Sequence, residues 1–138
     1  MAGLHFEFVS PETVLFSGDV DQVDLPGVEG DMGILAGHEA IVTALRPGIV
    51  TIHRGGAREP VVVTGGFAEV SSAGLTVLAD SAVPRETFDT AVLAAEIKDT
   101  EDDVADATNE AQRDKLTRHL DQLKQLQVAL GAAPSEHH

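Results

Sequence analysis

The sequence predicts an α+β fold, in which a β-rich N-terminal domain is followed by an antiparallel two-helix hairpin. Of the 13 glycines, twelve lie in the first 74 residues, where short apolar runs alternate with turn residues. From 75 to 130 there is no glycine, and the single proline of that segment, Pro84, falls where the pattern changes. Because glycine and proline interrupt helices, this change separates strands from helices. We expect a β domain at 1–84, a helical hairpin at 85–131 and a disordered tail at 132–138, in which His137 and His138 are candidates for a tag remnant.

Strand-sized apolar runs make up the N-terminal part. They are residues 4–8, which alternate in polarity, and residues 20–25, 41–45, 49–52, 61–64, 67–70 and 75–79. Pairs of turn residues, most of them containing two glycines or a proline and a glycine, separate the later runs at the spacing typical of hairpins. This pattern predicts a β-sandwich or a β-barrel.

The stretch 26–38 is unusually rich in turn residues. It holds four glycines beside Glu29, Asp31 and His38. Glycine at this density is needed where the backbone takes positive φ or approaches another surface closely, so we expect two tight reversals around residues 32–35. Two interpretations stay open at this point: a loop presented for binding, or a turn-rich connection in an all-β protein.

Two helices are expected after the glycine-rich part, at about 88–106 and 110–130. The polar segment between them ends the first helix and offers an N-cap to the second, and Gly131 is positioned to be the C′ residue. Leucines of the second helix recur at spacings of four, three and seven, which favours one buried face: Leu116, Leu120, Leu123 and Leu130. Such a stripe is more often core than a recognition surface, so we expect Leu116, Leu120 and Leu123 to form the seam of the hairpin.

The two helices carry opposite charge. Residues 89–106 hold seven acids and one base, Lys98, whereas residues 110–130 hold four bases and three acids, which gives −6 against +1. Opposite signs favour the helices lying together, although exposed pairs contribute only about 0.2–1 kcal/mol each.

Composition excludes several classes of protein. The net charge of −14, with only nine Lys and Arg, argues against nucleic acid and against anionic lipid as partners. The absence of cysteine excludes disulfides, thiolate catalysis and cysteine-bound zinc. No run approaches 18 apolar residues, and the N-terminus lacks a basic start, so we expect neither a membrane span nor a signal peptide.

No catalytic, metal or cofactor site is expected. The best metal candidates are His38 and Glu39 with Asp31, or His5 with His53, and neither set has the spacing that presents two ligands from one rigid element. The serines at 17 and at 71–72 read as turn residues without a nucleophile-elbow pattern. The glycine pair at 65–66 lacks the Lys and Ser or Thr of a phosphate loop.

Six short blocks, in order, resemble one family. They are Val9-Ser10-Pro11-Glu12; Leu15-Phe16-Ser17-Gly18; the stretch 26–38; Leu45-Arg46-Pro47-Gly48; Gly65-Gly66-Phe67-Ala68-Glu69-Val70; and Leu75-Thr76-Val77-Leu78-Ala79-Asp80. Together they resemble the epsilon subunit of bacterial F-type ATP synthase, which corresponds to the delta subunit of the mitochondrial enzyme. The resemblance covers residues 4–84 in detail and the helical region only by architecture.

The resemblance implies a ten-stranded β-sandwich followed by a helical hairpin, in a non-catalytic subunit of the central stalk. It implies contacts with the gamma subunit and the c-subunit ring, with Glu29, Asp31 and His38 at the end of the sandwich that meets the ring. The second of these positions is Asp where Glu is common in the family. The implied location is peripheral, at the cytoplasmic face of the bacterial inner membrane, reached only through the complex.

Two functions remain in competition. The first is a non-catalytic coupling subunit that transmits torque between the gamma subunit and the c ring and so couples rotation to ATP synthesis, with weak regulation of ATP hydrolysis by hairpin contacts with the alpha and beta catalytic subunits. The second is a nucleotide sensor that folds around ATP, since some members of the family bind ATP through an Asp followed three residues later by Arg-Ala. Here Asp89 is followed at those positions by Val92 and Leu93, so the guanidinium of that motif is missing and the sensor is disfavoured.

Overall fold

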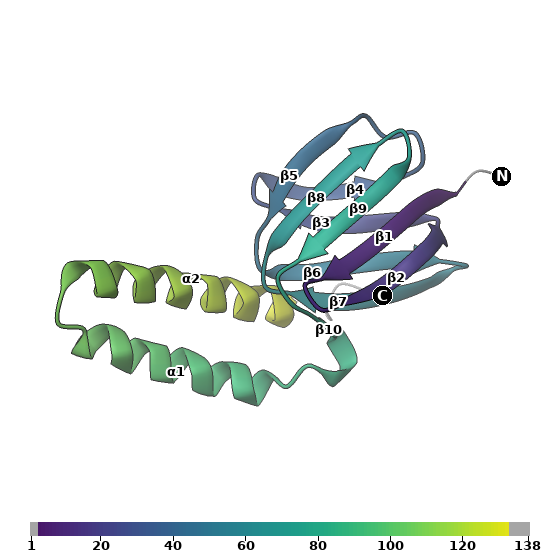
Figure 1. Cartoon of the computed structure of the whole chain (residues 1–138). Coiled ribbons are helices and arrows are strands. Elements are labelled where there is room, and N and C mark those ends of the chain that lie inside the picture. The colour runs from purple at the N-terminus through teal and green to yellow at the C-terminus, as the bar shows by residue number, and fades with distance from the viewer. Residues whose placement is uncertain (1–2, 133–138) are drawn as a thin grey trace. The chain divides into compact units, whose positions relative to one another are not determined.

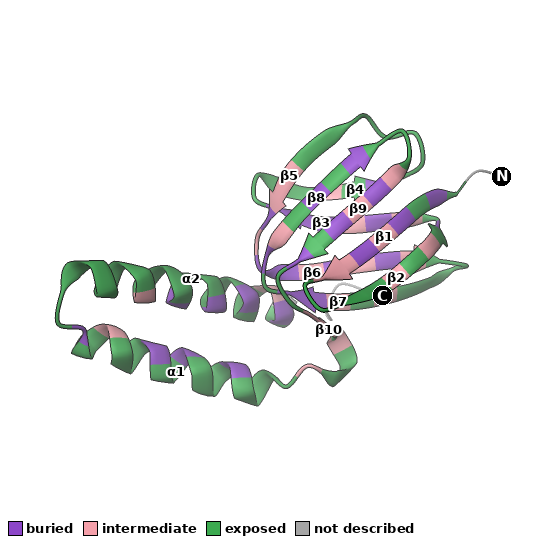
Figure 2. Ribbon diagram, in the orientation of Figure 1, coloured by how far each residue is buried: buried purple, intermediate pink, exposed green. Residues whose placement is uncertain are grey.

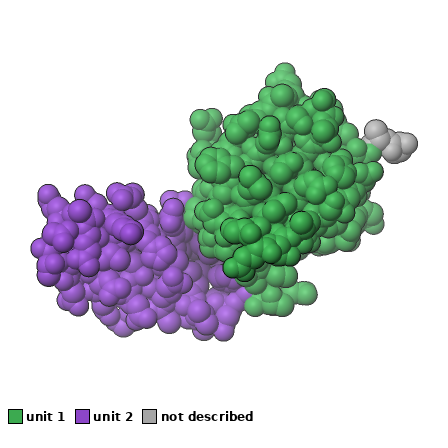
Figure 3. Space-filling view, in the orientation of Figure 1, with its two compact units in different colours: residues 1–87 green, residues 88–138 purple. Residues whose placement is uncertain are grey.

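The computed structural model describes residues 3–132 and has the predicted order, ten strands followed by two helices (Figure 1). The chain forms two compact units, Met1–Thr87 and Phe88–His138 (Figure 3). Of the predicted tail, residues 133–138, with His137 and His138, lie outside the described residues.

The first unit is a β-sandwich, which confirms the predicted fold class. Its strands follow the order β10-β7-β6-β3-β5-β8-β9-β1-β2, with β4 paired to β3. Figure 1 shows β5, β8, β9 and β1 as one layer, and β3, β6 and β7 behind it. The strands are β1 (Leu4–Ser10), β2 (Thr13–Val20), β3 (Gln22–Gly27), β4 (Gly30–Ile34), β5 (Ile41–Leu45), β6 (Gly48–Arg54), β7 (Ala57–Val63), β8 (Gly66–Ser71), β9 (Gly74–Ala79) and β10 (Ala82–Pro84).

Alternate residues of the strands fill the space between the layers (Figure 2). Phe6, Val23 and Ile34 are completely buried, and Phe8 is 1% exposed. The rings of Phe6 and Phe8 lie 5.5 Å apart between centroids, in a tilted arrangement. Period-two burial is what a sandwich requires, because successive side chains of a strand point to opposite faces.

Three strands were not predicted as such. β2 is exposed at five of its eight residues and contains Ser17 and Gly18, so it lacks the apolar alternation that marks a half-buried strand. Ser17 therefore lies in a strand rather than in a turn. β10 has only three residues, too few to show a pattern in the sequence, and is identified as a strand by its pairing with β7.

The third unpredicted strand corrects the expectation for residues 26–38. Rather than turning twice around residues 32–35, the chain forms a hairpin in which β4 pairs with β3 along its whole length. Gly30 and Gly37 take positive φ, as expected of turns. At Gly27 the reason for glycine is close approach of the backbone, because a Cβ there would lie 2.7 Å from the carbonyl oxygen of Gly30.

The second unit consists of α1 (Thr90–Asp106) and α2 (Glu110–Ala132). Asp89 caps α1, since its Oδ1 accepts hydrogen bonds from the amides of Ala91 and Val92 at 2.9 and 3.3 Å. Asn109 caps α2 by accepting from the Gln112 amide at 2.8 Å, as the sequence predicted. Gly131 was expected to end α2 but lies inside it. The helix continues for one residue beyond Gly131, to Ala132. A helical glycine costs only about 1 kcal/mol relative to alanine, so it does not by itself end a helix.

The helices are buried along facing stripes. On α1 these are Leu93, Ile97 and Thr100; on α2 they are Leu120, Leu123, Leu126 and Leu130. Leu116 is only half-buried, whereas Leu126, which was not predicted, is 2% exposed. Two polar side-chain contacts join the helices: an ion pair between Lys124 and Glu101 at 3.4 Å, in agreement with the opposite charges of the two segments, and a contact between His119 and Glu96 at 3.3 Å.

Candidate protein-interaction surfaces

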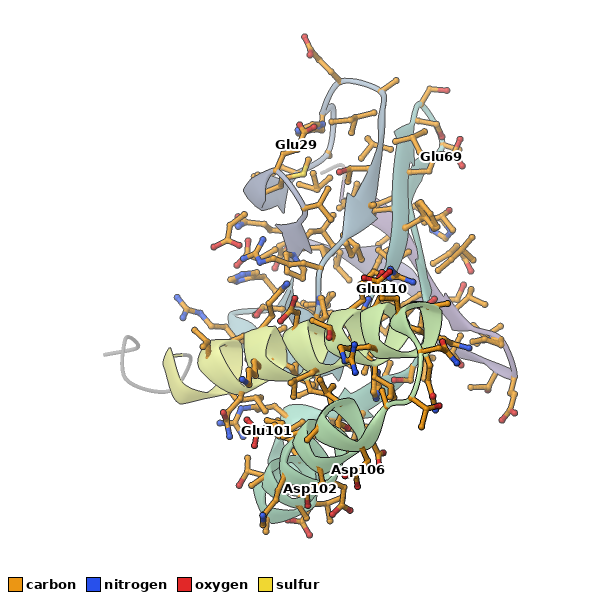
Figure 4. The ribbon with its side chains drawn as sticks, turned by 90° about the vertical axis from the view of Figure 1, so that its left-hand side faces the viewer. Glu29, Glu69, Glu101, Asp102, Asp106 and Glu110 are labelled. Atoms are coloured by element: carbon orange, nitrogen blue, oxygen red, sulfur yellow. The ribbon has the colours of Figure 1, made fainter. Side chains whose placement is uncertain are left out.

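The three predicted site residues lie on the β3–β4 hairpin and the turn that follows it. Glu29 is in the hairpin turn, and Figure 4 shows its side chain at the end of the hairpin. Asp31 lies on β4 opposite Pro26, with its side chain 81% exposed. His38 lies beyond β4, where its amide donates to the Leu35 carbonyl at 3.1 Å and its Nδ1 contacts the Glu39 carbonyl at 2.8 Å. All three residues are exposed.

Arg46, to which the sequence assigned no role, holds this end of the sandwich together. Its guanidinium donates to the Gly27 carbonyl and to the Asp31 carboxylate. Its amide also donates to the Pro26 carbonyl at 2.8 Å. The hairpin that carries Glu29 and Asp31 is therefore fixed to the segment after β5, which limits its freedom before any partner binds.

Large apolar side chains are exposed beside these polar groups. Val28 in the hairpin turn is 55% exposed, and Leu35 after β4 is 51% exposed. An end that combines carboxylates, a histidine and exposed aliphatic groups suits a partner whose surface is itself a mixture of polar and apolar groups.

A second surface is an apolar row that crosses five strands at the outer face of one layer. The strand pairings place these residues side by side: Ala44 on β5, Phe67 on β8, Leu78 on β9, Val9 on β1 and Val14 on β2. Phe67, Leu78 and Val14 are 58%, 53% and 60% exposed, and Val42 on β5 adds a further side chain that is 69% exposed. A contiguous row of this kind marks a surface that another molecule covers.

Two polar clusters elsewhere on the β unit contain the histidines and the serine that the sequence singled out. The predicted pair His5 and His53 is divided, since His5 contacts Glu7 and Asp19 while His53 contacts Asp24 at 2.7 Å. Ser17 donates to Glu7 at 2.7 Å, so its hydroxyl faces a carboxylate rather than an imidazole. Within residues 3–132, no group of three or more His, Cys, Asp or Glu side chains could hold a metal ion. The described helices also include none long and apolar enough to cross a membrane.

These features define a β-sandwich protein with an appended helical hairpin and two surfaces suited to protein partners. The family model described as the beta-sandwich domain of the ATP synthase delta/epsilon chain matches residues 3–85. The chain belongs to this family and is an epsilon chain of F-type ATP synthase, which confirms the predicted resemblance.

Named relatives are similar in sequence to this chain over nearly its whole length. The ATP synthase epsilon chain 1 of Nitrobacter hamburgensis is 51% identical over 94% of this chain and 96% of its own length. The epsilon chain of Parvibaculum lavamentivorans is 52% identical over 89% of this chain and 94% of its own.

Solved structures agree as well. A chain from the Euglena gracilis mitochondrial ATP synthase, solved as OSCP/F1/c-ring, is 29% identical, has a TM-score of 0.79, and is matched over 94% of this chain and 82% of that one. A chain from the central stalk and c-ring of the Tetrahymena thermophila enzyme, at 15% identity and a TM-score of 0.56, covers 62% of this chain and 69% of that one and supports the fold alone.

Proposed function

We propose that this epsilon chain is a non-catalytic subunit of the central stalk, and that it couples rotation of the c ring to ATP synthesis by binding both the gamma subunit and the ring. The Euglena relative was solved together with F1 and a c-ring, which supports the same assembly here. The observation that carries the proposal is the apolar row. A coupling subunit must bind the rotating gamma subunit tightly, and an exposed apolar row provides a surface for such binding.

The apolar row is the surface assigned to gamma. Phe67 and Leu78 are paired across β8 and β9 at its centre, so their side chains form one continuous apolar patch. Aromatic and aliphatic side chains at the centre of an interface contribute most of the binding free energy once water is excluded from them. Glu69 and Thr76, one rung further along the same two strands, provide a polar rim.

The β3–β4 end is the surface assigned to the c ring. Glu29, Asp31 and His38 present charged and hydrogen-bonding groups that suit the polar loops of c subunits, and Arg46 keeps the hairpin in place. Asp31 has a shorter reach than the Glu common in the family, and its bond to Arg46 shows that this carboxylate has a structural partner as well. Association with the membrane is then peripheral, through the ring, at the cytoplasmic face.

The hairpin is assigned a weak regulatory role. To inhibit ATP hydrolysis it would have to contact the alpha and beta subunits, whose acidic regions repel the acids of α1 labelled in Figure 4: Glu101, Asp102 and Asp106. The cross-helix contacts of Glu96 and Glu101 also favour the paired helices. Nucleotide sensing is not favoured, because the Asp89 carboxylate caps α1 and Val92 offers no cation.

Copurification tests the assignment to gamma. Wild-type chain mixed with purified gamma at micromolar concentration should elute as one complex from a size-exclusion column, and Phe67→Asp or Leu78→Asp should elute separately. Val128→Asp is the matched control, since Val128 is 71% exposed on α2 and lies outside the apolar row. Circular dichroism confirms that each variant is folded. Co-elution of folded Phe67→Asp with gamma at wild-type affinity would overturn the assignment.

A further inference from the structure

A four-residue polar cluster, His5, Glu7, Ser17 and Asp19, lies on the outer face of β1 and β2. His5 lies between two carboxylates: its Nδ1 is 3.2 Å from Asp19 Oδ1 and its Nε2 is 2.7 Å from Glu7 Oε2. The same oxygen of Glu7 also accepts a hydrogen bond from Ser17 Oγ at 2.7 Å. The cluster therefore joins the two strands through side chains, in addition to the backbone ladder.

This geometry depends on the protonation of His5. A neutral imidazole has one N–H and can donate to only one of the two carboxylates, whereas the imidazolium donates from both nitrogens. With His5 neutral, the unbonded nitrogen lone pair would face a carboxylate at hydrogen-bond distance, which is repulsive. Two carboxylates on either side of one ring thus favour the charged form.

Among the described residues, the strands beside the cluster carry few other charged groups. His5 pairs with Asp19 across the strands, and Gly74 on the other side approaches its backbone so closely that a Cβ would lie 2.3 Å from the His5 carbonyl oxygen. Two residues further along β1, Glu7 is paired with Thr76 on β9, and Thr76 is paired in turn with Glu69 on β8. The groups that face the cluster from β8 and β9 are therefore one acid and no base, which also favours a positive charge on His5.

The cluster acts at the edge of the sheet. β2 is the last strand in the sheet order, and within residues 3–132 its ladder is formed with β1 alone. A register shift between Phe8 and Val9 interrupts that ladder towards the β1–β2 turn. The cluster lies on the other half of the strand pair, where it supplements an unsupported edge. Edge strands are the parts of a sheet that open most easily.

We propose that His5, Glu7 and Asp19 form a pH-dependent clasp, which holds β2 against β1 while His5 is protonated and loosens the edge when His5 loses its proton. The pKa directions agree with this geometry. Hydrogen bonds to Glu7, and then to Asp19, raise the pKa of His5 above its ordinary value of 6.5. The hydrogen bond from Ser17, and then that from His5, lower the pKa of Glu7 below its ordinary value of 4.5.

The sign of the pH dependence follows from these directions. A raised pKa in the folded state means that the contribution of His5 is complete below pH 6.5 and is lost as the pH rises through the higher folded value. A lowered pKa means that the contribution of Glu7 is complete above pH 4.5 and is lost as the pH falls through the lower folded value. The clasp is therefore tightest between these two pH values.

Amide hydrogen exchange of the full chain, corrected for the intrinsic pH dependence of exchange, tests the clasp. Protection of the β1–β2 amides should fall several-fold between pH 6 and pH 8.5, while protection at the β8–β9 ladder should stay constant. In His5→Gln the β1–β2 step should disappear. His53→Gln, which removes a histidine bonded to a carboxylate on another strand pair, should keep it.

Proton NMR of the His5 ring gives a second measurement that does not depend on how far the edge opens. Its titration midpoint should lie above 6.5 and should fall towards that value in both Glu7→Gln and Asp19→Asn. Constant β1–β2 protection across the pH range in the wild-type chain, or a pH step that persists in His5→Gln, would overturn the proposal. Both results are independent of whether the chain assembles with gamma.

Discussion

At the scale of single residues, the surface proposed to meet the ring can be separated from the residues that support it. Asp31 and Glu29 are exposed, so their side chains contribute little to folding even though they are placed accurately. The Asp31–Arg46 pair is a surface ion pair, a class that contributes about 0–1 kcal/mol, and Arg46 keeps its bond to the Gly27 carbonyl when Asp31 is changed.

We therefore expect Asp31→Asn and His38→Ala to change the free energy of unfolding by less than about 1 kcal/mol, because neither residue is a cap or part of the core. ATP-driven proton pumping by the assembled enzyme should fall in the same variants. A melting temperature lowered by ten degrees with pumping intact would show that these residues are structural.

Gly66 is the opposite case, a residue that the frame requires. It takes a φ of +143°, and a Cβ there would lie 2.1 Å from the Leu78 carbonyl oxygen in the neighbouring strand. Gly66→Ala should destabilise the sandwich by at least the roughly 1–3 kcal/mol typical of a strained backbone conformation. Gly131→Ala, in the last turn of α2 where a Cβ meets nothing within 4 Å, is the control and should stabilise slightly. Urea unfolding measures both, and equal midpoints for the two variants would contradict this account.

At the scale of elements, the sequence predicted the strands and helices whose apolar residues recur with a clear period. The strands with alternating burial and the two helices follow from patterns that physical rules cover, and the N-cap of α2, Asn109, lies in the polar segment where a cap was expected. β2 and β4 were missed because exposed edge strands rich in glycine and polar residues carry little alternation. Arg46 was missed because its partners, Gly27 and Asp31, are 19 and 15 residues away and meet it only through the pairing of β3 with its neighbours.

The seam of the hairpin gives a test at this scale. Leu126 is 2% exposed, so Leu126→Ala should cost about 2–5 kcal/mol through lost burial and the cavity left behind. Leu116→Ala should cost less, since that side chain is only half-buried. Val128→Ala, at a position 71% exposed on the same helix, should be close to neutral. Thermal unfolding followed by circular dichroism at 222 nm ranks the three variants, and a neutral Leu126→Ala would contradict the observed seam.

At the scale of the whole molecule, the proposed functions assign the two units different tasks. The β unit carries both proposed partner surfaces, and its core lies within residues 4–82. A chain ending at Thr87 should therefore fold cooperatively and still bind gamma. If the hairpin regulates weakly, the assembled enzyme with this shortened chain should hydrolyse ATP at less than twice the wild-type rate. A several-fold rise would show that the hairpin is a strong inhibitor.

The apolar row is proposed to join this chain to gamma and so to couple rotation of the c ring to ATP synthesis. The most direct measurement is ATP-driven proton pumping by membranes stripped of this subunit and then supplied with purified chain. Wild-type chain and Val128→Asp should restore pumping, and folded Phe67→Asp should not, even when added at tenfold higher concentration than the wild-type chain. Full restoration of pumping by Phe67→Asp at the wild-type concentration would contradict the account.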